Sequence, residues 1–164
     1  SRGGPVYLRL GKAGEPDLTA HAVTPFEVGK IHTLKEGAKV CIVSYGPIMK
    51  MAFEVARLIE AQQQHPVAVV CSHTLKPLDL PGLTEVLQQF ETVIVIEEHS
   101  ERGGLSAQMK QLAWECGAKA QLRTFGLQDA FIHVHGSHAD LLSAHGLSAE
   151  RIAASVLDSM AVAK

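Results

Sequence analysis

Two acids, a histidine and a pair of glycines follow the end of an apolar run. This stretch, VIEEHSERGG, extends from Val95 to Gly104. Paired carboxylates beside a histidine are residue types of general acid–base catalysis, so Glu97, Glu98 and His99 are candidates for that chemistry. Successive residues of a strand point to opposite faces of its sheet, so at most alternate members could share one site. We therefore favour the alternative, in which these are hydrated charges at the end of a strand.

The glycine pair of this stretch suggests a different chemistry, the binding of an anion. Glycines between a strand and a helix allow close backbone approach, and the first N–H groups of a helix carry partial positive charge. Gly103 and Gly104 are therefore a candidate anion site. The surrounding residues match neither G-x-G-x-x-G nor a Walker loop, so turn geometry alone is the other explanation.

A second group of titratable residues lies in HVHGSH. Its histidines, His133, His135 and His138, have spacings that could chelate a transition metal. No cysteine or carboxylate with conventional ligand spacing accompanies them. We therefore expect solvent-exposed histidines and assign no metal-binding residue.

Nucleophilic chemistry has little basis in this sequence. The cysteines are odd in number, widely spaced and without a C-x-x-C pair, which favours buried free thiols over a zinc site or a disulfide. They are Cys41, Cys71 and Cys116. No G-x-S-x-G motif is present, and Ser44 lies within an apolar run, so we exclude serine hydrolysis. We assign no catalytic residue.

Arg9 lies within the otherwise apolar run VYLRLG. A guanidinium rarely enters such a run without a partner, and its planar fork suits a phosphate or a carboxylate. The alternative is an outward-facing arginine in a half-buried strand, and the local sequence does not separate the two.

The composition indicates a folded protein and excludes several classes of partner. Of the 164 residues, 46% are hydrophobic and 20% charged, and the formal net charge is -2. This length is enough for one substantial core, and the small net charge argues against a nucleic-acid partner. No apolar stretch reaches about 18 residues and no signal-peptide pattern is present, so we expect no membrane interaction and a cytoplasmic location.

Four short apolar runs rich in β-branched residues predict the strands of a sheet. Runs that are apolar on both faces are typical of buried parallel strands, which need crossover helices between them. The runs are 40–45, 67–71, 93–97 and 120–125. Helical patterns follow them, so the sequence predicts an α/β fold.

Helix signals occur between and after these runs. An apolar stripe predicts a helix over 48–63, and a short helix with Asp79 as its N-cap ends by Phe90. A third helix follows the glycine pair and ends at Gly117. Two more helices begin at caps near the C-terminus, a capping box of Ser137 with Asp140 and then Ser148.

The first part of the chain is harder to interpret locally. The stretch TPFE, residues 24–27, has the spacing of a helix start, yet β-branched residues follow it. Upstream, residues 5–10 read as a strand, and the turn-forming residues after them read as a linker.

In their order along the chain, these pieces resemble the C-terminal part of the transketolase family, whose members use thiamine diphosphate. The matching stretches are GPVYLRLGK, EGAKVCIVSYG, TLKPLD, VIVIEEHSERGGLSAQ and HVHGSHADLLSAHGLSAERIAASV. KPLD, and EEH with a following glycine pair, also occur in deoxyxylulose phosphate synthases and in the beta subunits of 2-oxo acid dehydrogenases. VYLRLGK favours transketolase itself.

The resemblance implies an architecture. It implies a three-layer α/β/α domain with a mostly parallel five-stranded sheet. Residues 1–24 would be the end of a pyrimidine-binding domain and a linker, and residues 25–164 the C-terminal domain. The stretch FEVGKIHTLKEG would be extended rather than helical, and the glycine pair would serve backbone geometry rather than catalysis.

The resemblance also implies a function. Arg9 matches the arginine that contacts the phosphate of the sugar substrate in relatives with a Y-x-R strand. The full enzyme would bind thiamine diphosphate and magnesium. The family's G-D-G motif and the glutamate that activates the cofactor are absent from this sequence, so we expect this chain alone to bind neither and to be inactive.

The expected activity is the transfer of two-carbon ketol units between sugar phosphates, with this domain contributing structure and a dimer interface. The expected partners are the remaining thiamine-diphosphate-binding domains or a partner subunit, in a homodimer. Two alternatives stay open. One is a free-standing module that binds an anion or a nucleotide at the carboxyl edge of its sheet. The other is a part of a deoxyxylulose phosphate synthase or of a 2-oxo acid dehydrogenase beta subunit.

Overall fold

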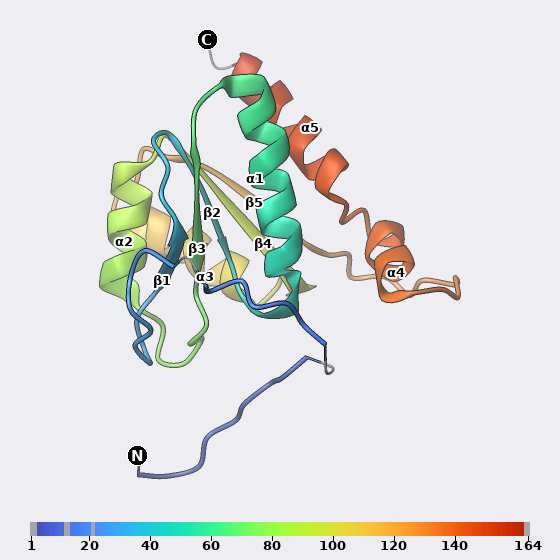
Figure 1. The fold of residues 1–164 in the computed structure, drawn as a ribbon, viewed down its shortest axis with the longest axis horizontal. Coiled ribbons are helices and arrows are strands. Elements are labelled where there is room, and N and C mark those ends of the chain that lie inside the picture. Colours follow the sequence, from blue (N-terminus) through green and yellow to red (C-terminus); the bar gives the residue numbers. More distant parts are fainter. Residues whose placement is uncertain (1–2, 12–13, 21, 163–164) are drawn as a thin grey trace.

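The fold is a five-stranded sheet with helices on both faces. The computed structural model describes residues 3–11, 14–20 and 22–162 (Figure 1). The strands are β1 (His32–Lys35), β2 (Val40–Ser44), β3 (Val67–Cys71), β4 (Thr92–Ser100) and β5 (Gln121–Leu127). The helices are η1 (Gly46–Ile48), α1 (Met49–Gln63), α2 (Leu80–Gln89), α3 (Leu105–Glu115), α4 (His138–Ala144) and α5 (Ala149–Val162).

The sheet has the strand order β1-β3-β2-β4-β5. The pairs β2 with β3, β2 with β4 and β4 with β5 are parallel, whereas β1 pairs antiparallel with β3. The predicted mostly parallel, five-stranded α/β sheet is therefore confirmed. The four apolar runs became β2 to β5, while the short edge strand β1 has a more polar sequence, HTLK.

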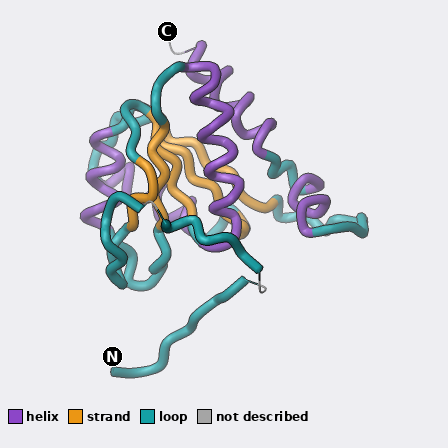
Figure 2. Tube along the Cα trace, viewed as in Figure 1, coloured by secondary structure: helices purple, strands orange, loops and turns teal. Residues whose placement is uncertain are grey.

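Alternating residues of the central strands form two cores, one on each face. Ile42 and Ile94 pack under α1 and α5, whereas Val43 and Val95 pack under α2 and α3. Figure 2 shows the helices on either side of the sheet, so the three-layer arrangement is also confirmed.

The helix ends follow the predicted signals. Asp79 caps α2 by accepting a hydrogen bond from the Gly82 N–H, and Gly117 adopts a positive φ just beyond α3. Ser137 and Asp140 form the capping box of α4, and Ser148 Oγ accepts from the Arg151 N–H at the start of α5. Residues 24–27 form no helix, in agreement with the extended interpretation.

The strand predicted over residues 5–10 is wrong for this structure. The segment is extended but unpaired, and the side chains of Val6, Tyr7, Leu8 and Leu10 are 71 to 88% exposed. A strand needs a neighbour to satisfy its backbone N–H and C=O groups, and the described part of the chain provides none there. Figure 1 shows the segment running away from the sheet. No described helix is both long and apolar enough to cross a membrane.

Candidate functional site

The chemistry-bearing residues gather where the parallel strands end. Because β2, β3 and β4 are parallel, their carboxyl ends meet at one edge of the sheet. Tyr45 follows β2, His73 lies just beyond β3, and Glu97 lies toward the end of β4. We call this group, together with Arg9 and Glu98, the carboxyl-edge site.

Glu97 is fully buried, so the prediction of a hydrated charge is wrong for this residue. Its Oε2 accepts from the Leu105 N–H at 2.9 Å and its Oε1 from the Ser106 N–H at 2.8 Å. The Tyr45 hydroxyl donates to Oε2 at 3.1 Å. A buried carboxylate is tolerated here because the first N–H groups of α3 and a phenol replace its water.

The same contacts explain why glycines occupy positions 103 and 104. A Cβ at position 104 would overlap the Glu97 carboxylate, and Gly103 adopts a φ of +81° in open space. The anion that binds the first N–H groups of α3 in this structure is therefore the protein's own Glu97. An external anion at Gly103 and Gly104 would have to compete with that carboxylate, and nothing in the structure favours it.

Tyr45 links this buried carboxylate to the N-terminal segment. Burial and the Glu97 carboxylate raise the pKa of Tyr45, and the nearby Arg9 guanidinium partly opposes them. The segment is held over η1 by the Glu15–Lys50 ion pair of 2.5 Å and by the approach of Gly11 to Pro47. Arg9 itself is exposed, and its charge acts on Tyr45, which lies at the carboxyl edge.

Two further sets of titratable side chains remain, Glu98 and the histidines of HVHGSH. Glu98 is partly exposed, and its Oε1 lies 3.0 Å from His138 Nε2 at the start of α4. His133 and His135 are exposed, as expected. Within the ranges that the structure describes, no three histidine, cysteine or acidic side chains lie close enough together to hold a metal ion.

The cysteines are free thiols, as predicted, but only Cys41 is fully buried. Burial raises the pKa of Cys41. Burial also raises the pKa of Cys71 to about 11, against the opposing effect of hydrogen bonds from the Gly46 and His73 backbone. Both are therefore protonated near neutral pH and poor nucleophiles.

Sequence reasoning missed the second role of Asp79. Besides capping α2, its Oδ2 accepts from the Ile31 N–H at 3.0 Å, and its Oδ1 lies 3.5 Å from Lys30 Nζ. Asp79 thus joins the segment before β1 to the start of α2. The motif KPLD gave a signal for the cap alone, because the partners just before β1 are distant in sequence.

Sequence reasoning also missed a group of aromatic rings beside the contacts of Asp79. The Phe26 ring stacks on His73 with centroids 4.4 Å apart, and His32 meets both rings edge-on. Burial, and to a smaller extent His32, lower the pKa of His73. Residues 24–32 are therefore fixed against the loop that follows β3.

Comparisons with known proteins identify relatives of this chain. A family model described as the transketolase C-terminal domain matches residues 29–152. One subunit of the apulose-4-phosphate transketolase of Phocaeicola vulgatus is 29% identical over 94% of this chain, which spans 48% of that protein. A 1-deoxy-D-xylulose-5-phosphate synthase of Chlorobaculum tepidum is 31% identical over 94% of the chain and 24% of its own length. The chain thus spans less than half of either relative.

Solved structures give the same result. A split-gene transketolase, described as an inactive beta4 tetramer, has 34% identity and a TM-score of 0.80 over 94% of this chain and 50% of its own. The transketolase of Campylobacter jejuni shares the fold at 17% identity and a TM-score of 0.55, over 91% of this chain and 20% of its own. These matches show that the chain belongs to the transketolase family, as a C-terminal domain.

Proposed function

We propose that this chain is the C-terminal part of a transketolase-like enzyme that transfers two-carbon ketol units between sugar phosphates. Residues 1–24 would be the end of a pyrimidine-binding domain and a linker, and residues 25–164 the C-terminal domain. The observation that carries the proposal is the likeness to the split-gene transketolase, which extends over 94% of this chain. The exposed apolar side chains of residues 5–10 agree with it, since they would be covered by a neighbouring sheet.

Thiamine diphosphate and magnesium, which the family implies, do not fit the residues that the structure describes. The N-terminus of α3, where a diphosphate could bind, is filled by the Glu97 carboxylate. The described residues also include no acidic or histidine cluster that suits a metal ion. We therefore assign the cofactor to the remaining domains or to a partner subunit, and we derive no step through it.

Arg9 is the residue we propose to contact substrate. Its exposed guanidinium beside the carboxyl edge would bind the phosphate group of the sugar in a bidentate manner. The 25–164 domain would position this segment through the Glu15–Lys50 ion pair and the packing of Gly11 on Pro47. The part of the 25–164 domain in the reaction is thus structural. We further propose that this domain takes part in a homodimer interface.

The test is an assay of the enzyme assembled from this chain and the cofactor-binding part of the same enzyme. With thiamine diphosphate, magnesium, a ketose phosphate donor and an aldose phosphate acceptor, we expect a new ketose phosphate, and none when this chain is omitted. In a parallel assay with pyruvate as the donor and glyceraldehyde 3-phosphate as the acceptor, formation of 1-deoxy-D-xylulose 5-phosphate with release of carbon dioxide would assign the chain to the synthase branch. Light scattering of the assembled enzyme tests the dimer.

A further inference from the structure

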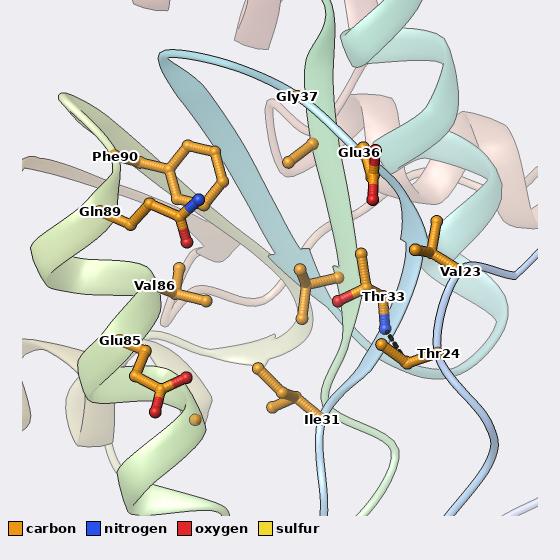
Figure 3. A pocket seen from close by; sticks show the side chains of 13 residues that line it. Val23, Thr24, Ile31, Thr33, Glu36, Gly37, Glu85, Val86, Gln89 and Phe90 are labelled. Atoms are coloured by element: carbon orange, nitrogen blue, oxygen red, sulfur yellow. Dashed lines mark hydrogen bonds between the residues drawn. The ribbon is translucent and has the colours of Figure 1, made fainter.

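Tyr45 lies between β2 and η1, at the carboxyl edge of the sheet. Its hydroxyl donates to the fully buried Glu97 at 3.1 Å, and its ring packs against the core under α2 and α3. Other residues line the groove of about 460 Å³ between α2 and β1, so this tyrosine is not part of that groove (Figure 3). Glu97 is itself held by two N–H groups of α3, so the phenol has a fixed place.

The N-terminal segment passes close to the turn that carries this tyrosine. A Cβ at Gly11 would lie 3.1 Å from Pro47 Cγ in η1, so the segment and the turn are in close approach. The ion pair between Glu15 and Lys50 holds the segment at the same place. Arg9 precedes Gly11 by two residues, a span of at most about 7 Å of backbone. The arginine is therefore carried past the end of β2.

The charges around the phenol show that Arg9 acts on it. Burial and the Glu97 carboxylate raise the pKa of Tyr45, whereas the Arg9 guanidinium lowers it. Coulomb interactions weaken with distance and are screened by water, so an exposed guanidinium has this effect because it lies near the phenol. A phenol that gives its hydrogen to a carboxylate keeps the lone pairs of its oxygen, and the N–H groups of a guanidinium donate to such an oxygen.

We propose that Tyr45 is a positioning residue, which holds the Arg9 guanidinium where the phosphate group of the sugar binds. The proposal rests on the function proposed above, in which Arg9 contacts that phosphate. An arginine on an exposed, extended segment has many rotamers, and fixing one of them before the substrate arrives lowers the entropy cost of binding. Glu97 thus fixes Tyr45, and Tyr45 fixes Arg9. A substrate without a phosphate gains nothing from this arrangement, so Tyr45 adds to the selectivity for phosphorylated sugars.

Fluorine nuclear magnetic resonance of this chain tests the link between the two side chains without any reaction. The sequence has two tyrosines, Tyr7 and Tyr45, so labelling with 3-fluorotyrosine gives two signals, and Tyr7→Phe identifies that of Tyr45. We expect Arg9→Ala to move the Tyr45 signal. The matched control, Arg57→Ala, removes an exposed arginine of α1 and should leave that signal in place. A Tyr45 signal that stays in place in Arg9→Ala would overturn the proposal.

Kinetics of the assembled enzyme test the effect on substrate. Tyr45→Phe removes only the hydroxyl and should raise KM for phosphorylated substrates by roughly threefold to tenfold, as expected for one hydrogen bond, with kcat unchanged. Unphosphorylated analogues should react as they do with the parent enzyme. In the Arg9→Ala background, Tyr45→Phe should have no further effect, because a positioning residue acts only through the group that it positions.

Two results of these kinetics would make Tyr45 structural and overturn the proposal. One is an equal loss for phosphorylated and unphosphorylated substrates. The other is an undiminished effect of Tyr45→Phe when Arg9 is absent. If the assembled enzyme forms no ketose phosphate at all, the proposed function fails, and the fluorine signal of Tyr45 still decides whether this tyrosine holds Arg9.

Discussion

Replacing Gly104 by valine tests whether the EEHSERGG stretch serves geometry or chemistry. The new Cβ would overlap the Glu97 carboxylate, which is fully buried and bonded to two backbone N–H groups and the Tyr45 hydroxyl. Displacing the carboxylate would weaken hydrogen bonds to a charged group, each worth about 1.5 to 3 kcal/mol. Overpacking would add about 1 to 3 kcal/mol. We therefore expect Gly104→Val to lower the free energy of unfolding by at least about 3 kcal/mol.

Glu98→Gln is the matched comparison on a nearby residue of the same stretch. Glu98 is partly exposed and pairs with the exposed His138, so its loss should change stability by no more than about 0.5 kcal/mol. Urea unfolding of both variants, followed by circular dichroism, gives the ranking. If Gly104→Val unfolds like the parent chain while Glu98→Gln abolishes turnover of the assembled enzyme without changing stability, the geometric explanation is refuted and the acids are catalytic.

Three further predictions concern Asp79, Arg9 and the cofactor. Burial raises the pKa of Asp79, but hydrogen bonds from the Ile31 and Gly82 N–H groups and the Lys30 ammonium outweigh it and hold the pKa below its ordinary value. The stability that this carboxylate contributes is therefore full above about pH 4 and is lost as the pH falls through the lower pKa of the folded state. Urea unfolding between about pH 5 and 2.5 should show that the free energy of unfolding falls less for Asp79→Asn than for the parent chain. Arg9→Ala in the assembled enzyme should reduce kcat/KM for phosphorylated substrates by at least about tenfold, and less for unphosphorylated analogues; equal losses would make Arg9 structural. Calorimetric titration of this chain alone with thiamine diphosphate and magnesium should give no saturable heat, and micromolar binding would contradict the division of roles proposed above.

The central sheet and most helix ends could be predicted from local sequence. Strands that are apolar on both faces leave a continuous hydrophobic run, so the predicted runs 40–45 and 67–71 match β2 and β3 to within one residue. The run 93–97 covers only the first part of β4, because that strand continues through the polar residues up to Ser100. The caps at Asp79 and Ser137 follow from side chains that bond N–H groups only two or three residues away. Signals of this kind need no knowledge of the rest of the fold.

The features that sequence reasoning missed depend on distant partners. β1 is a four-residue edge strand that exists through its antiparallel pairing with β3, so its own residues carry little pattern. The sequence predicts a hydrated Glu97, because nothing local shows that the start of α3 folds back onto its carboxylate. Residues 5–10 have the composition of a strand but find no neighbour in the described part of this chain, and the pattern alone does not report that.

The most direct test of the proposed activity follows the carbon atoms. The assembled enzyme is given a ketose phosphate donor labelled with ¹³C at C1 and C2 together with an unlabelled aldose phosphate, and the products are analysed by nuclear magnetic resonance. We predict that both labels move together and appear as adjacent carbons at C1 and C2 of the new ketose phosphate. Labels that remain in the donor, or that separate from each other, would contradict ketol transfer as the function of this enzyme.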